Sequence, residues 1–268
     1  LVPKKSLIDA GIHYLQKQGK NTGIPEREII HIAILSLGLN DTVKFDPDEK
    51  IIEYRINKGT KRLVDMTLTK FADELSSDSP APGGGSVAAL CGALSASLSS
   101  MVANLTYGKK GYERVTKAMT EVSVQAQELK RTFLELIDRD TDAFNTFMAA
   151  SKMPRKTDEQ KAEREKALQA ATKHATMIPL ETVRASVDII RLAEVVSKKG
   201  NAHALSDAAV AAIMAESAAE SAYLNVKINV PGITDKTFVA DVMKEANELL
   251  KTVKNGRKRI VAAVSNKL

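Results

Sequence analysis

The stretch YERVTKAMTEVSVQAQELKRTFLELIDRDTDAFNTFMAAS, residues 112–151, decides the fold because its apolar residues recur with a helical period. Two rows of residues spaced by seven run along it: Val115, Val122, Leu129, Leu136 and Ala143, and Met119, Ala126, Phe133, Asp140 and Phe147. No glycine or proline interrupts the stretch, and Pro154 marks its end. A helix of this length with two apolar rows must pack against other long helices, so the pattern predicts a helical bundle.

Helical periods also dominate the chain on either side of this stretch. Further helices are expected at about 66–76, 86–106, 157–198 and 203–228, and from a cap at Thr234 to near the C-terminus. Thr157 and Gln160 form a capping-box pattern, and Pro179 should kink the helix that they start. In the helix at 86–106 one stripe consists of Leu90, Leu94, Leu98 and Met101. The short connections predict an all-α fold, an antiparallel bundle of long helices.

The first 56 residues have a different character. Two short helices are expected at 3–18 and 25–37, followed by a β-favouring run at 51–56. This part is therefore predicted to be a short mixed α/β segment. The polar stretch NKGTKR at 57–62 reads as a linker, and residues 63–268 are predicted to form one helical domain.

Composition narrows the class of protein. The formal net charge is +6, which suits an anionic metabolite as well as nucleic acid. The basic run at 255–259 has no interleaved aromatic residues and is expected to be a solvated helix face, so we predict no nucleic-acid partner. Residues 79–108 carry no charge, but their glycines and serines favour a buried helix over a membrane span. The single Cys91 excludes an intramolecular disulfide. We expect no signal peptide. The spacing of the histidines and the cysteine does not predict a metal site.

Asp140 is the most informative residue of the chain, because it takes a place in a row whose other members are apolar. A carboxylate on a buried stripe is costly unless it is paired or functional. Burial would raise its pKa toward neutrality, where a carboxyl group can accept and return a proton. The alternative is a structural aspartate satisfied by a polar side chain of a neighbouring helix. Asp138 and Asp142 fall on other faces and are expected to be solvated.

Three further segments contain candidate binding residues. Gly83, Gly84 and Gly85 precede a helix that has Ser86 near its N-terminus, an arrangement that exposes backbone N–H groups to an anion, although it also suits a plain flexible turn. The other candidates, in TYGKKGY at 106–112 and GNAHALSD at 200–207, are Tyr107, Lys109, Lys110, Asn201, Ser206 and Asp207. The two lysines could hold a carboxylate or phosphate, or could be ordinary exposed loop residues. Ser206 or Asp207 could equally cap a helix.

Several blocks of the sequence together resemble the cyclodeaminase domain family of the formimidoyltransferase-cyclodeaminases. The blocks are APGGGSVAAL at 81–90, SMVANLTYGKK at 100–110, DRDTDAF at 138–144, GNAHALSD at 200–207 and AYLNVKIN at 222–229. They follow the family order and span about three quarters of the chain. Residues 1–56 resemble the end of the formimidoyltransferase half, without the segment that would carry its catalytic histidine, so we expect no transferase activity.

The resemblance implies an all-helical enzyme that forms a homodimer or a larger homo-oligomer and works in the cytoplasm, in histidine degradation and one-carbon metabolism. It implies conversion of 5-formimidoyltetrahydrofolate to 5,10-methenyltetrahydrofolate and ammonia, with Asp140 as the catalytic acid and base. No cofactor is expected, because the tetrahydrofolate derivative is the substrate, and Lys109, Lys110 and the glycine-loop amides are expected to dock its polyglutamate tail. Two alternatives are a methenyltetrahydrofolate cyclohydrolase and a non-enzymatic helical interaction module in which Asp140 only packs.

Overall fold

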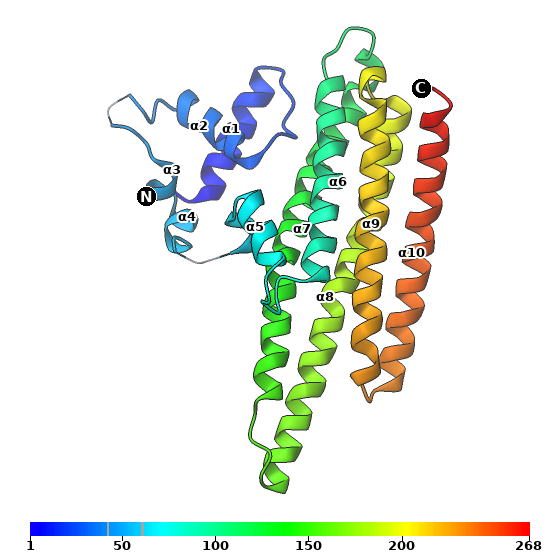
Figure 1. Ribbon diagram of the computed structural model, residues 1–268. Coiled ribbons are helices and arrows are strands. Elements are labelled where there is room, and N and C mark those ends of the chain that lie inside the picture. The colour runs from blue at the N-terminus through cyan, green and yellow to red at the C-terminus, as the bar shows by residue number, and fades with distance from the viewer. Residues whose placement is uncertain (42, 60–61) are drawn as a thin grey trace.

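A computed structural model describes residues 1–41, 43–59 and 62–268 (Figure 1). In the described chain, five long helices form an antiparallel bundle: α6 (Gly84–Thr106), α7 (Thr116–Ser151), α8 (Asp158–Lys199), α9 (Leu205–Asn229) and α10 (Lys236–Ser265). The short α5 (Leu68–Leu75) precedes them and begins at Thr67, whose side chain accepts a hydrogen bond from the Lys70 amide. The predicted all-α bundle is confirmed. Part of the predicted linker, residues 60 and 61, lies outside the described residues.

Small side chains let three of the bundle helices approach closely. The face of α6 that packs inward is built from alanine and serine, and the α9 face opposite it is almost entirely alanine. The Ser95 hydroxyl donates a hydrogen bond of 2.7 Å to the backbone carbonyl of Ala211, which links α6 directly to the α9 main chain. On α7, both predicted apolar rows are buried where they cross α6, with Phe133 and Leu136 fully inaccessible to solvent. A Cβ on Gly92 would lie 2.3 Å from the Phe133 ring, so only glycine fits there.

The leucine stripe of α6 is only partly covered, since Leu90 and Leu98 pack against the core whereas Leu94 and Met101 are exposed. Leu94 is 47% exposed and Met101 is 37% exposed, while the opposite face of the helix holds the buried alanines. The periodicity showed that one side of α6 is rich in leucine, but close packing against α7 and α9 selects the side with small residues. Apolar surface is therefore left uncovered within one chain.

Of the helices described, α6 is long and apolar enough to cross a membrane by length and composition, and 61% of its most apolar window is buried inside the protein. The core helix of a bundle passes the same test, so this observation is weak evidence for a membrane span.

Helix α8 runs unbroken through Pro179. Proline has no backbone N–H, so the carbonyl four residues earlier, that of Ala175, has no helical donor. The side-chain amide of Asn229, the last residue of α9, donates a hydrogen bond of 2.9 Å to this carbonyl. The proline thus creates a polar link between α8 and the end of α9.

Residues 1–41 and 43–59 form a small unit with its own apolar cluster. Its helices are α1 (Lys4–Lys17), α2 (Glu26–Ser36), α3 (Pro47–Lys50) and α4 (Ile52–Ile56). The predicted β-favouring run at 51–56 is wrong: only Ile51 forms a bridge, to Val2, and the following residues are helical. A single bridge offers no further strand to pair with, so the chain satisfies its backbone groups within a helical turn.

The loop between α1 and α2 is fixed against the bundle. Asn21 is buried, and its side-chain amide donates to Asn104 of α6 at 2.6 Å and to the Ser123 hydroxyl of α7 at 2.9 Å. A Cβ on Gly23 would lie 2.0 Å from that hydroxyl.

The predicted start of the last helix needs a small correction. Asp235, and not Thr234, is the N-cap of α10, since its carboxylate accepts a hydrogen bond from the Phe238 amide. The Thr157–Gln160 capping box at the start of α8 is confirmed.

Candidate active site

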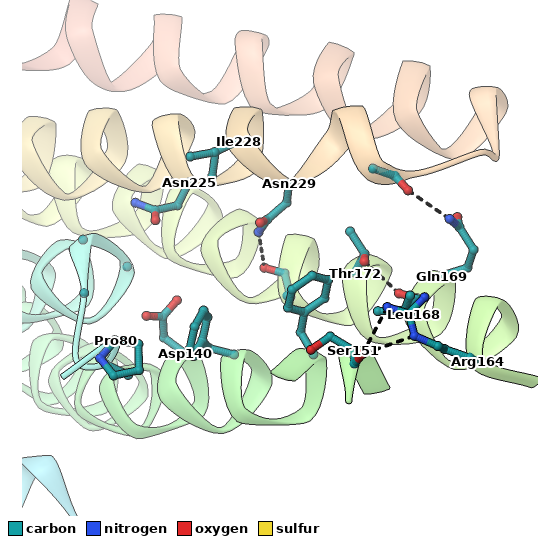
Figure 2. Close-up of a pocket in the computed structure, with 18 of the residues that line it drawn as sticks. Pro80, Asp140, Ser151, Arg164, Leu168, Gln169, Thr172, Asn225, Ile228 and Asn229 are labelled. Atoms are coloured by element: carbon teal, nitrogen blue, oxygen red, sulfur yellow. Dashed lines mark hydrogen bonds between the residues drawn. The ribbon is translucent and has the colours of Figure 1, made fainter. Parts of the chain in front are cut away.

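A cavity of about 620 Å³ lies where the first turn of α6 meets α7, α8 and the end of α9 (Figure 2). This volume is in the usual range for a small-molecule site. The lining residues are Pro80, Ala81, Gly83, Gly84, Gly85, Asp140, Phe144, Phe147, Ser151, Arg164, Glu165, Leu168, Gln169, Thr172, Ala175, Asn225, Ile228, Asn229 and Gly232. The cavity therefore combines an aromatic wall with a small number of polar groups.

Asp140 projects from α7 beside the first turn of α6. Its Oδ2 lies 3.2 Å from the Ser86 hydroxyl, which also lies 3.0 Å from the carbonyl of Ile137, so one hydroxyl proton serves two acceptors. A Cβ on Gly85 would lie 2.0 Å from Oδ1 of Asp140. Glycine at 85 is thus required for the helix terminus to approach the carboxyl group this closely.

Two opposing influences act on the pKa of Asp140. Burial raises this pKa from its ordinary value, because the charged form loses its hydration, and burial is the larger influence. The Ser86 hydroxyl and backbone act in the opposite direction, since they stabilise the charged form. A carboxyl group with a raised pKa next to a cavity is suited to accept a proton and to return it.

The cavity wall beyond Asp140 is aromatic on one side and carries amides on the other. Phe144 and Phe147 follow Asp140 at one and two turns along α7, on the same side of that helix. Asn225 and Asn229 are one turn apart near the end of α9 and face the cavity from the opposite side (Figure 2). Flat apolar rings and amides of this kind suit a planar heterocycle with polar edges.

The structure separates the predicted site residues into two groups. Gly83, Gly84, Gly85 and Asp140 line the cavity, and the fully buried Ser86 contacts Asp140 beside it. The remaining predicted residues lie beyond the other end of α6, which has 23 residues and is roughly 35 Å long (Figure 1). Within one chain the second group does not reach the cavity; it consists of Tyr107, Lys109, Lys110, Asn201, Ser206 and Asp207.

Three of the six residues of the second group, Tyr107, Lys109 and Asn201, join loops to one another. The ammonium group of Lys109 donates to the Asn201 side chain at 2.9 Å, and the Tyr107 hydroxyl donates to the carbonyl of Gly19 at 3.0 Å. Asn201 also caps the short helix that precedes α9. The N-cap of α9 is Ala204, so neither Ser206 nor Asp207 caps that helix with its side chain. Their predicted role in substrate binding stays a prediction.

The acids next to Asp140 behave differently from each other. Asp142 is exposed, as predicted. Asp138 is half-buried and accepts a hydrogen bond of 2.7 Å from the Leu63 amide, so its prediction as a solvated surface acid is wrong. It fixes the start of the helical domain to α7.

Sequence reasoning missed several lining residues. Phe147 was visible as the next member of the Asp140 row, and Asn225 and Asn229 stand four apart, the spacing of one helical face, which is a detectable pattern. Arg164 gave no local signal, because its place depends on how α8 turns back along α7.

Comparisons with known proteins show the family and agree with the fold. A family model described as formiminotransferase-cyclodeaminase matches residues 67–248, and a formiminotransferase domain model matches residues 1–57. A formiminotetrahydrofolate cyclodeaminase structure from Thermotoga maritima superposes with a TM-score of 0.69 at 29% identity, covering 75% of this chain and 97% of that one. This likeness confirms the helical bundle.

Two kinds of curated relative are similar to the chain. A methenyltetrahydrofolate cyclohydrolase of Methylorubrum extorquens is 41% identical over 202 residues, which are 75% of this chain and 97% of the relative. The formimidoyltransferase-cyclodeaminase of Gallus gallus is 33% identical over an alignment of 269 positions, which covers all of this chain and 50% of the relative. This chain thus spans about half the length of the bifunctional relative. The chain belongs to the formiminotransferase-cyclodeaminase family of folate enzymes.

Proposed function

We propose that this chain converts 5-formimidoyltetrahydrofolate to 5,10-methenyltetrahydrofolate and ammonia. The observation that carries the proposal is the half-buried carboxyl group of Asp140, which faces a cavity of suitable size. The match of residues 1–57 to a formiminotransferase domain supports a formimidoyl substrate, since that domain name refers to the same one-carbon group.

The chemistry needs little more than positioning and proton transfer. N10 attacks the carbon of the formimidoyl group on N5, whose imine nitrogen is protonated; the C=N π bond breaks, and a new C–N bond closes a five-membered ring. Because both groups are in one molecule, much of the proximity advantage is already present in the substrate. N10 then loses its proton, and the former imine nitrogen, now an amine, must gain one. When the C–N bond to that amine breaks, ammonia leaves and the positive charge stays on the methenyl group.

Asp140 can perform both proton transfers in sequence. As a carboxylate it accepts the N10 proton, and as a carboxylic acid it delivers that proton to the leaving amine. The carboxyl group is restored after each turnover, so no cofactor is required by this scheme. The Ser86 hydroxyl donates to Oδ2 of Asp140 at 3.2 Å and holds the carboxyl group in its position at the cavity.

The test is ammonia release together with methenyl absorbance, measured on the purified chain and on Asp140→Asn. Asparagine has nearly the same shape but cannot exchange the proton, so turnover should fall by about 10²- to 10⁴-fold while substrate still binds. Equal turnover by the two proteins would remove Asp140 from the mechanism. Binding without turnover by both would favour the non-enzymatic alternative.

A second function has a specific observation in its favour, since the cyclohydrolase relative is 41% identical. In that reaction water adds to the methenyl carbon, and Asp140 would accept a proton from the water. Rates on the formimidoyl and methenyl substrates distinguish the two functions. Cyclodeaminase function predicts the faster reaction with the formimidoyl compound.

We also propose that the chain works as a homodimer or larger homo-oligomer, in the cytoplasm and in histidine degradation. Support for the assembly comes from apolar side chains that one chain leaves exposed: Leu94 and Leu105 on α6, and Leu224 on α9, are between 47% and 59% exposed. A second copy could cover them. Light scattering on the wild type and on Leu94→Glu tests this, and a monomeric wild type would refute it.

A further inference from the structure

Arg164 lies at the end of the cavity opposite Asp140, on the second turn of α8. Among the described residues that line the cavity, it is the one with a cationic side chain. No carboxylate of the described chain lies within ion-pair distance of its guanidinium group. By contrast, Arg139 and Arg184, on the outside of α7 and α8, each form a two-point ion pair with a glutamate.

The guanidinium of Arg164 is held in place by a backbone group. Its Nε and Nη2 donate hydrogen bonds of 3.2 and 3.1 Å to the carbonyl of Ser151, the last residue of α7 (Figure 2). That carbonyl has no donor within its own helix, so the contact caps α7. An arginine has five N–H groups, and those on Nη1 have no acceptor among the described residues. The side chain is thus fixed and still has a free edge for a ligand.

The distance from Asp140 to this edge matches part of a folate molecule. About three turns of α7 separate Asp140 from Ser151, which is roughly 16 Å along the axis. An extended p-aminobenzoyl group with one glutamate is about as long as three or four peptide residues, on the order of 10–14 Å. Phe144 and Phe147 line the interval and can contact the benzoyl ring.

We propose that Arg164 binds a carboxylate of the glutamate tail while N5 and N10 of the folate lie at Asp140; this rests on the proposed function. A guanidinium offers the planar pair of donors that a carboxylate accepts. The assignment replaces Lys109 and Lys110 as the first docking group of the tail within one chain.

Glu165 provides a second test of the proposal, because it lines the same end of the cavity as Arg164 and carries the opposite charge. Its carboxylate accepts a hydrogen bond of 3.0 Å from Gln169. A ligand carboxylate at Arg164 is repelled by Glu165, so removal of that negative charge should strengthen binding of the tail. A purely structural role for Arg164 predicts no such gain.

The experiment compares two stable ligands, 5-formyltetrahydrofolate and 5-formyltetrahydropteroate, which lacks the glutamate. Calorimetry gives the Kd of each ligand for wild type, Arg164→Met, Glu165→Gln and Arg184→Met. Arg164→Met should weaken the glutamate-bearing ligand about 10- to 100-fold and leave the pteroate within about twofold. Glu165→Gln should tighten the glutamate-bearing ligand about two- to fivefold. Arg184→Met, on the same helix but outside the cavity, should change neither.

Because Arg164 also caps α7, its replacement can disturb the bundle. A structural defect would weaken both ligands alike, so equal losses in the Arg164→Met protein overturn the proposal, as does an unchanged Kd for the glutamate-bearing ligand. Failure of the proposed function gives a different result: wild type then binds both ligands with the expected difference but releases no ammonia from the formimidoyl substrate.

Discussion

Gly85→Ala tests the contact between the N-terminus of α6 and the carboxyl group of Asp140, the group proposed to transfer the proton. An added Cβ would lie 2.0 Å from Oδ1, 2.5 Å from Cγ and 2.6 Å from Oδ2 of Asp140. Ordinary contacts to a Cβ begin at 3.4 Å, so the carboxyl group must withdraw by on the order of 1 Å. A misplacement of that size costs about 100-fold in rate, and we therefore expect kcat to fall by about this factor.

The fold should survive the same change. Alanine is the better helix former by about 1 kcal/mol, which offsets part of the cost of the displaced carboxyl group. The neighbouring glycines provide a graded comparison: a Cβ on Gly84 would lie 3.3 Å from the Asn225 amide, and one on Gly83 would meet nothing within 4 Å. Methenyl absorbance should show the largest loss of activity for Gly85→Ala, a smaller loss for Gly84→Ala and the smallest for Gly83→Ala. Thermal melts of the three variants check that each is folded. A folded Gly85→Ala protein with turnover near wild type would refute the reasoning.

Three further predictions follow from the same contacts. Burial raises the pKa of Asp140 above its ordinary value of 3.8, so the native state binds this proton more tightly than the unfolded chain does. The free energy of unfolding of wild type should therefore fall, relative to that of Asp140→Asn, as pH rises above 3.8. Urea melts of both proteins at several pH values measure this difference. The kcat of wild type should fall in acid, as pH drops through that raised pKa, because the reaction starts from the carboxylate. Asn229→Leu leaves the Ala175 carbonyl without its donor and should lower the free energy of unfolding, measured with urea, by about 1–3 kcal/mol. The control Asn145→Leu, at an exposed position, should lower it by less than about 0.5 kcal/mol.

Periodicity was sufficient to predict the long helices and the place of Asp140, because both depend on residues close in sequence. The rows of α7 are buried as expected, and Asp140 emerges from them where the bundle opens into the cavity. The exposure of Leu94 and Met101 on α6 could not be predicted in the same way. Whether leucines or alanines face inward depends on how closely the neighbouring helices approach, and that distance is set by all of them together.

The extent of the site was also beyond local reasoning. Lys109 and Asn201 stand in sequence blocks that look functional, yet both lie a full helix length from the cavity in one chain. Arg164 is ordinary in its local sequence and reaches the cavity only because α8 folds back along α7. The prediction of a β-favouring run at 51–56 was wrong for a different reason, because residues with β propensity do not form a strand where the fold supplies no partner strand.

The central claim is that one carboxyl group, shielded from water beside the folate nitrogens, transfers the proton that leaves with ammonia. The most direct measurement is single-turnover formation of the methenyl product from 5-formimidoyltetrahydrofolate, with wild type and Asp140→Asn each at saturating protein. The account predicts stoichiometric ammonia and methenyl product with wild type, and bound but unconverted substrate with the asparagine protein. Product formation at the same rate by both proteins would contradict it.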